Sequence, residues 1–162
     1  MSHVNFSKMP LTKYQLEKCK SLTEKLIAWP LCQPFVEMVD PERDGAPNYL
    51  QIIKEPMALQ KVLSNLKNGK YDTIEAWKSD VNLIWDNARK YNGEDALYTH
   101  MSAEAKLWFN KKVQNFPSSQ EEEWMGKMQR ASQRFMHCIS HPPADIDPHG
   151  FITDSVANLR HK

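Results

Sequence analysis

The chain has four segments in which apolar residues recur every three or four positions, the spacing of a helix with one buried face. Each segment is followed closely by a proline or an Asn-Gly pair, and these residues commonly end helices. Because each helix has a single apolar stripe, an antiparallel four-helix bundle is the most economical way to bury all four stripes. The sequence therefore predicts an all-α fold. The predicted helices cover residues 11–28, 57–67, 74–91 and 96–114.

A long connection joins the first two predicted helices. Residues 29–56 contain five prolines and one glycine, which interrupt helical geometry, and they exceed the usual connection length of about 4–6 residues. Loops this long are usually functional or disordered. The apolar side chains of this loop would be costly to expose to water, so we expect the loop to be packed rather than disordered. These side chains are Phe35, Val36, Met38, Val39, Tyr49, Ile52 and Ile53.

A fifth helix is predicted after the bundle. Ser118 or Ser119, followed by three glutamates, is a typical helix start because the acids suit the helix dipole. The apolar face of this helix is rich in methionine and includes Trp124, Met128 and Phe135. Such a face must pack on something, which leaves two alternatives, the bundle or a partner protein.

The tail after this helix is rich in proline and aspartate and is predicted to be irregular. Residues 151–159 would form one marginal turn or a docking segment. The predicted boundaries are an N-terminal extension at 1–10, a helical domain at 11–117, the additional helix at 118–140 and the irregular tail at 141–162.

Charge and composition narrow the functional classes. Lysine and arginine total 21 against 20 acidic residues, so no global field favours strong direct binding of nucleic acid or anionic lipid. No apolar run approaches the roughly 18–20 residues of a membrane span, and residues 1–12 lack the features of a secretory signal. The three cysteines are far apart and odd in number, which indicates free thiols. We therefore expect a soluble protein that stays inside the cell.

Four motifs stand at mutually consistent spacings in and after the long loop. They are Pro34-Phe35 with Val39 four residues beyond Phe35, Pro47-Asn48-Tyr49, the segment Ile52-Ile53-Lys54-Glu55-Pro56-Met57, and Tyr91-Asn92. At these motifs the sequence resembles a bromodomain, the acetyl-lysine-binding four-helix module with a long loop between its first two helices. The resemblance covers about residues 11–115 and implies a left-handed bundle with a binding function.

The resemblance implies a role for each site residue. The Asn92 amide would donate a hydrogen bond to the acetyl carbonyl, and the Tyr49 hydroxyl would hold a water that bridges to the same oxygen. Acetylation leaves a thin neutral stem, which suits a narrow apolar slot. An unmodified lysine would lose its hydration in a slot that offers no carboxylate, at a cost of several kcal/mol. The walls would be Pro34, Phe35, Val39, Ala88 and Tyr91.

Several positions depart from the family pattern. Met38 stands where bromodomains commonly have a second proline, so we expect this part of the loop to be looser. At the rim, the polar residue Gln33 precedes Pro34-Phe35, so the apolar surface beside the entrance is smaller. Asp44 and Ala46 replace residues that are often leucine or isoleucine, which predicts a wider and more polar mouth. The residue that narrows the entrance is Tyr98, or Leu97 if the preceding loop is shorter.

Each site residue also has an ordinary structural interpretation. Asn92 before Gly93 could be only a helix C-cap, and Tyr49 only a half-buried aromatic residue. The joint spacing of the motifs favours the binding site. An alternative function is a bromodomain-like scaffold with little acetyl-lysine affinity, which acts through its C-terminal helix. The polar rim residues motivate this alternative.

Other chemistry has weaker support in the sequence. His137, Cys138 and His141, with His149, have spacings that could suit zinc, but histidines at a helix end are the commoner explanation. No nucleophile, metal set or phosphate loop is apparent, so we expect no enzyme activity and no cofactor. The predicted function is non-catalytic recognition of acetylated lysine in histone or other protein tails, in the nucleus. Residues 118–140 are predicted to contact proteins of chromatin complexes.

Overall fold

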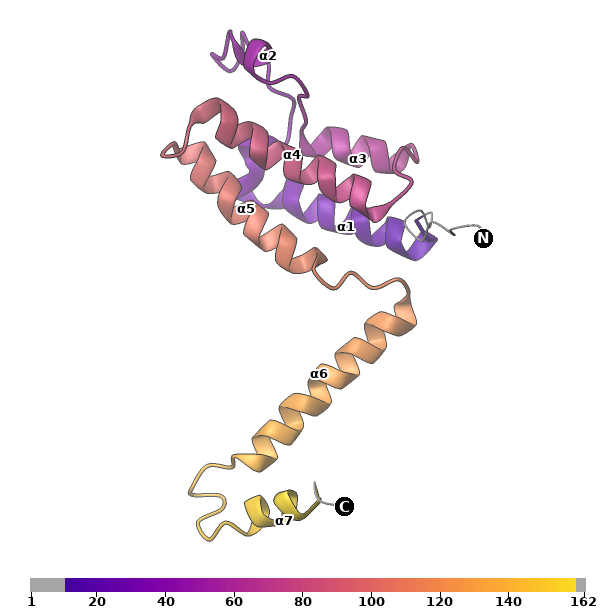
Figure 1. Cartoon of the computed structure of the whole chain (residues 1–162), viewed down its shortest axis with the longest axis vertical. Coiled ribbons are helices and arrows are strands. Elements are labelled where there is room, and N and C mark those ends of the chain that lie inside the picture. Colours follow the sequence, from indigo (N-terminus) through magenta and orange to yellow (C-terminus); the bar gives the residue numbers. More distant parts are fainter. Residues whose placement is uncertain (1–10, 160–162) are drawn as a thin grey trace, which may run out of the picture. The chain divides into compact units, whose positions relative to one another are not determined.

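A computed structural model describes residues 11–159, and every regular element in this range is a helix (Figure 1). The predicted extension at 1–10 falls outside these residues. The described residues divide into two compact units, which lie within residues 1–118 and 119–162. The elements are α1 (Lys13–Ala28), the 3₁₀ helix η1 (Pro30–Phe35), α2 (Tyr49–Ile52), α3 (Leu59–Lys67), α4 (Ile74–Asn92), α5 (Leu97–Val113), α6 (Gln120–Ser140) and α7 (Phe151–Leu159).

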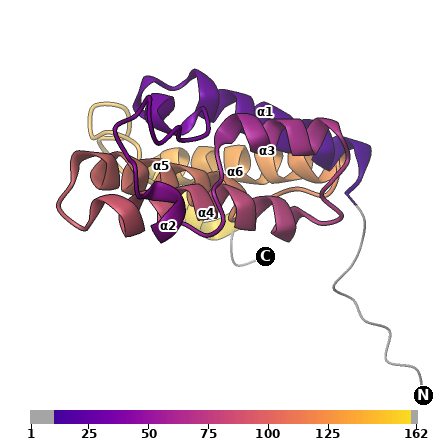
Figure 2. The same cartoon turned by 90° about the horizontal axis from the view of Figure 1, so that it is seen from above.

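Helices α1, α3, α4 and α5 lie side by side and form the predicted four-helix bundle (Figure 2). Their ends follow local signals in the sequence. Thr12 caps α1 through a capping box with Gln15, and Thr73 caps α4 by accepting a hydrogen bond from the amide of Ala76. Helix α4 ends at Asn92 because Gly93 adopts a φ of 84°, a conformation that L side chains rarely adopt. The predicted all-α fold is therefore confirmed.

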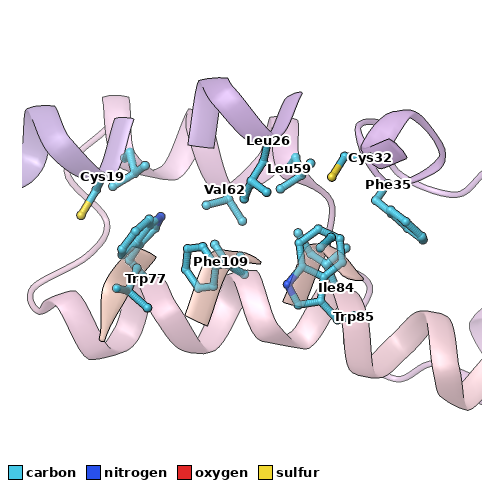
Figure 3. Packing of buried hydrophobic residues seen from close by; sticks show 14 of the residues in the cluster. Cys19, Leu26, Cys32, Phe35, Leu59, Val62, Trp77, Ile84, Trp85 and Phe109 are labelled. Carbon is cyan, nitrogen blue, oxygen red and sulfur yellow. The ribbon is translucent and has the colours of Figure 1, made fainter. Parts of the chain in front are cut away.

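The buried core is formed by apolar side chains from the four helices and from η1, and Val62 and Phe109 point toward each other in Figure 3. The rings of Trp77 and Phe109 meet edge to face with centroids 5.2 Å apart. The indole nitrogen of Trp77 donates a hydrogen bond to the Thr23 hydroxyl at 3.2 Å, and this hydroxyl donates to the carbonyl oxygen of Cys19 at 2.8 Å. The Trp77 indole, the Thr23 hydroxyl and the Cys19 carbonyl thus satisfy one another, which removes most of the cost of burying these three groups.

The cysteines are free thiols, as the sequence predicts. Cys19 and Cys32 lie in the core, where burial raises the pKa of Cys19 to about 12 and that of Cys32 to about 11. Cys138 is exposed on α6. The two core cysteines therefore act as small apolar side chains.

The long loop between α1 and α3 is packed, as expected from its apolar residues. It begins with η1 and contains the short helix α2, and it buries Phe35, Ala46, Tyr49 and Ile53. The amide of Gln60 in α3 donates a hydrogen bond to the carbonyl oxygen of Val36 at 3.0 Å. This bond fixes the first half of the loop to the bundle.

The unit 119–162 contains the predicted fifth helix. Ser119, rather than Ser118, caps α6 by accepting a hydrogen bond from the amide of Glu122. Trp124, Met128 and Phe135 are each more than half exposed. None of the helices in residues 11–159 has the length and apolar character needed to cross a membrane.

Residues 141–150 of the predicted irregular tail form no regular element, whereas residues 151–159, for which the sequence predicts one marginal turn or a docking segment, form helix α7 (Phe151–Leu159). The physical reason lies just before this helix. The Asp147 carboxylate accepts hydrogen bonds from the amides of Ile152 at 3.2 Å and Thr153 at 3.1 Å, so it satisfies amides of the first helical turn. The sequence places Asp147 directly before Pro148, a pair that is more typical of a turn than of a distant helix cap.

Thr23→Val tests the buried polar contact between α1 and α4. Valine has nearly the same shape but neither donates to Cys19 nor accepts from Trp77, so the buried indole N–H loses its partner. We expect the free energy of unfolding to fall by about 1–3 kcal/mol, measured by urea denaturation followed by circular dichroism. A valine variant as stable as the wild type would show that the hydroxyl contributes nothing to the fold.

Candidate functional site

A cavity of about 420 Å³ lies between the long loop and the adjoining ends of α4 and α5. The loop contributes one wall, the last turns of α4 contribute the opposite wall, and Tyr98 is contributed by the first turn of α5. The structure therefore brings together residues that are up to 65 positions apart in the chain, from Gln33 to Tyr98. The lining residues are Gln33, Pro34, Phe35, Val36, Glu37, Val39, Arg43, Asp44, Ala46, Tyr49, Met57, Ile84, Ala88, Tyr91, Asn92 and Tyr98.

Aromatic contacts fix both ends of the loop against α4. The Phe35 ring meets the Trp85 ring edge to face with centroids 5.4 Å apart, and Tyr49 meets Tyr91 in the same way at 4.9 Å. The Tyr91 hydroxyl also donates to the Asn48 side-chain oxygen at 2.9 Å. The apolar walls are therefore held in place before any ligand arrives.

A further hydrogen bond from α4 holds the end of the loop that leads into α3. The Asn87 amide donates to the carbonyl oxygen of Glu55 at 2.8 Å, and Asn87 is itself buried. This bond positions the segment that leads through Met57 into α3. Met57 and the nearby Ile84 extend the apolar lining of the cavity.

Asn92 is the last residue of α4 and lines the cavity. Its side-chain amide donates a hydrogen bond to the carbonyl oxygen of Ala88 at 2.8 Å. A carboxamide nitrogen has two N–H groups, so this bond orients the amide and uses only one of them. The turn that follows is fixed as well, because the Thr99 hydroxyl donates to the carbonyl oxygen of Gly93, and Arg89 pairs with Glu94 at 2.7 Å.

Tyr49 is the buried polar residue of the loop wall, with 5% of its surface exposed. Burial, reinforced by the neighbouring Tyr91, raises the pKa of its hydroxyl above the ordinary value. The hydroxyl therefore stays protonated at neutral pH and can both donate and accept hydrogen bonds.

The rim residues occupy distinct positions. Tyr98 lines the cavity and is 48% exposed, whereas Leu97 is 71% exposed and is not among the lining residues. Gln33 lines the cavity while its amide donates to the carbonyl oxygen of Ile27 at 2.9 Å. Ala46 belongs to the buried cluster with Tyr49. Every other site residue predicted from the sequence lines the cavity, so Leu97 is the exception.

Charged side chains at the mouth are the main departure from the predicted slot. The sequence predicts Asp44 at a more polar mouth and no carboxylate within the slot, whereas Glu37 lines the cavity together with Asp44. The Arg43 guanidinium bonds both carboxylates and also donates to the carbonyl oxygen of Met38 at 3.3 Å. The last contact opposes the loosening expected at Met38. Hydrogen bonds from the Arg43 side chain and the Asp40 amide hold the pKa of Asp44 at about 2, so this carboxylate is ionised at neutral pH.

Sequence reasoning missed some of the lining residues. Val36, Met57 and Ile84 are apolar residues within predicted packed segments, and only the fold shows which of them reach the cavity. Glu37 and Arg43 are exposed charged residues of a loop, and periodicity carries no signal for such positions.

The histidines near the end of α6 were the other candidate site. The rings of His137 and His141 lie with centroids 4.5 Å apart, and Nδ1 of His141 lies 3.1 Å from the carbonyl oxygen of His137. Across the part of the chain that the structure describes, His, Cys, Asp and Glu side chains form no group of three or more suited to a metal ion. The contacts of His141 agree with a helix-end interaction.

Comparisons with known proteins relate the chain to proteins of chromatin. Nucleosome-remodeling factor subunit NURF301 of Drosophila melanogaster is 31% identical over 106 residues, which are 65% of this chain and 4% of that protein. Histone acetyltransferase GCN5 of Debaryomyces hansenii is 31% identical over 106 residues, or 65% and 22% of the two chains. Bromodomain-containing factor 2 of Saccharomyces cerevisiae is 38% identical over 77 residues, or 48% and 12%.

The chain thus spans between 4% and 22% of the length of these relatives, so the likeness concerns one module of each. Residues 19–104 match the bromodomain family, and this match includes α3, α4, the long loop and every residue that lines the cavity. The chain therefore belongs to the bromodomain family, whose module is a reader of acetylated lysine.

Proposed function

We propose that the cavity of residues 11–117 binds acetylated lysine without catalysing a reaction, and that histone tails supply this lysine. The observation that carries the proposal is the pairing of apolar walls with the Asn92 amide and the protonated Tyr49 hydroxyl. An acetamide is neutral and has a strong carbonyl acceptor, so it matches this combination of groups. The cavity volume of about 420 Å³ is within the range of small-molecule sites.

Binding of one acetylated side chain covers a small surface, so we expect a dissociation constant in the micromolar to millimolar range, about −8 to −4 kcal/mol. The names of the relatives support a chromatin setting, since they include a nucleosome-remodeling factor subunit and a histone acetyltransferase. On this basis we propose a nuclear location and histone ligands for this chain.

Asn92→Ala tests the proposal. The variant removes the side-chain donor, so binding of acetylated histone-tail peptides should weaken by about 1–3 kcal/mol and become undetectable for weak ligands. We would measure both proteins against arrays of acetylated peptides and their unacetylated counterparts. Circular dichroism would establish that the variant folds.

Asn110→Ala is the matched control, because Asn110 is an exposed residue of α5 outside the cavity lining. This variant should bind as the wild type does. A folded wild-type protein with no acetyl-dependent binding would contradict the proposal, and so would an Asn92→Ala variant with full affinity.

A second role follows from the exposed apolar face of α6. Trp124, Met125, Met128 and Phe135 are each more than half exposed, and a face of this size on one helix is typical of interaction segments. We propose that residues 118–140 contact proteins of chromatin complexes. The scaffold alternative assigns the whole function to this face.

Deleting residues 119–162 separates the two roles. Every side chain of the buried core lies between Cys19 and Val113, so the truncated protein should keep its Tm within about 4 °C, the shift expected for a loss of about 1 kcal/mol. Its affinity for acetylated peptides should be unchanged. A larger fall in Tm would show that α6 stabilises the bundle and would contradict a role limited to partner contacts.

A further inference from the structure

Two carboxylates line the cavity of a site that we propose to be selective for a neutral ligand. Glu37 and Asp44 belong to the lining, and Asp44 is ionised at neutral pH. A carboxylate next to an apolar cavity favours an unmodified lysine, because it offers the ammonium a counter-charge in exchange for lost hydration. Unless another group is bonded to these two carboxylates, they therefore reduce the preference of the cavity for acetyl-lysine over lysine.

The Arg43 guanidinium is hydrogen-bonded to both carboxylates. Its Nε donates to Oδ1 of Asp44 at 2.8 Å and its Nη2 donates to Oδ2 of Asp44 at 3.0 Å, which makes a bidentate pair. Its Nη1 donates to Oε2 of Glu37 at 3.1 Å. One planar guanidinium thus bridges two carboxylates, which the single ammonium of a lysine could not do with the same geometry.

Hydrogen bonds of the loop backbone also keep Arg43 and Asp44 next to each other. The Asp40 carboxylate accepts hydrogen bonds from the amides of Glu42 at 3.0 Å and Arg43 at 3.1 Å, which closes a tight turn. The Asp40 amide donates to Oδ2 of Asp44 at 2.9 Å, the same oxygen that accepts from Nη2 of Arg43. The turn therefore positions Arg43 beside Asp44 through the backbone as well as through charge.

We propose that Arg43 is a specificity-determining residue, which excludes unmodified lysine by keeping Glu37 and Asp44 paired. This inference rests on the proposed acetyl-lysine function. An entering ammonium finds both carboxylates already bonded, whereas an acetamide needs neither of them. Arg43 acts on selectivity through its two partners.

Removing Arg43 should change the selectivity for acetyl-lysine over lysine by a limited amount. The three side chains are partly exposed, and ion pairs in such positions change equilibria by a few fold. Arg43→Gln replaces the guanidinium by a shorter, neutral amide, so Glu37 and Asp44 lose their charged partner. We expect the ratio of the dissociation constants for lysine and acetyl-lysine to fall by about twofold to fivefold, mainly because lysine binds more tightly.

The probes are lysine and Nε-acetyl-lysine with both backbone ends blocked, so that they differ only at the side-chain nitrogen. Each probe would be titrated into the full chain and followed by NMR chemical shifts. The triple variant Arg43→Gln, Glu37→Gln, Asp44→Asn should regain the wild-type ratio, because it removes the freed carboxylates. Lys106→Gln is the matched control, since Lys106 pairs with Asp86 and lies outside the cavity lining.

The outcomes separate this inference from the proposed function. A wild-type chain that does not bind blocked acetyl-lysine would overturn the proposed function and the inference with it. If the wild type binds and Arg43→Gln keeps the same ratio, or loses affinity for both probes equally, only the inference is overturned. A Lys106→Gln variant that changes the ratio as much as Arg43→Gln would also overturn it, because net charge would then explain the result.

Discussion

The site depends on the attachment of one long loop to helix α4. Ordering a loop of this length has a large entropic cost, which local turns alone do not offset. The offset comes from burial of Phe35 against Trp85 and of Tyr49 against Tyr91, one contact at each end of the loop. Both aromatic partners belong to α4, which also contributes Asn92, so one helix positions the loop and the polar group of the cavity.

The helices of the bundle could be predicted from the sequence because their stability comes from apolar stripes that have a fixed period. The capping residues Thr12 and Thr73 and the stop at Gly93 agree with these stripes, so local and global signals indicate the same ends. Helix α7 could not be predicted in this way. It begins after an acidic side chain that bonds amides five and six residues ahead, and no periodic pattern reports such a bond.

The residues of the cavity also divide into those that the sequence predicts and those that it does not. The wall residues and Asn92 were predicted from motifs whose spacing is a property of the family, and the structure places them around one cavity. At the mouth, Asp44 was predicted, but Glu37, Arg43 and their pairing with Asp44 were missed, because that pairing depends on a turn set by Asp40. Residue type gives no indication of whether an exposed acid is free or already paired.

The contrast among the three thiols has a practical consequence. Alkylating reagents react with the thiolate, and a thiol buried in the core with a pKa of about 12 or 11 forms almost none of it at neutral pH. Cys19 and Cys32 are therefore shielded from such reagents by the folded core. Cys138 is exposed and lies on α6, outside the module that contains the cavity. A maleimide fluorophore would thus attach at one position of the native chain, without substitution of any residue.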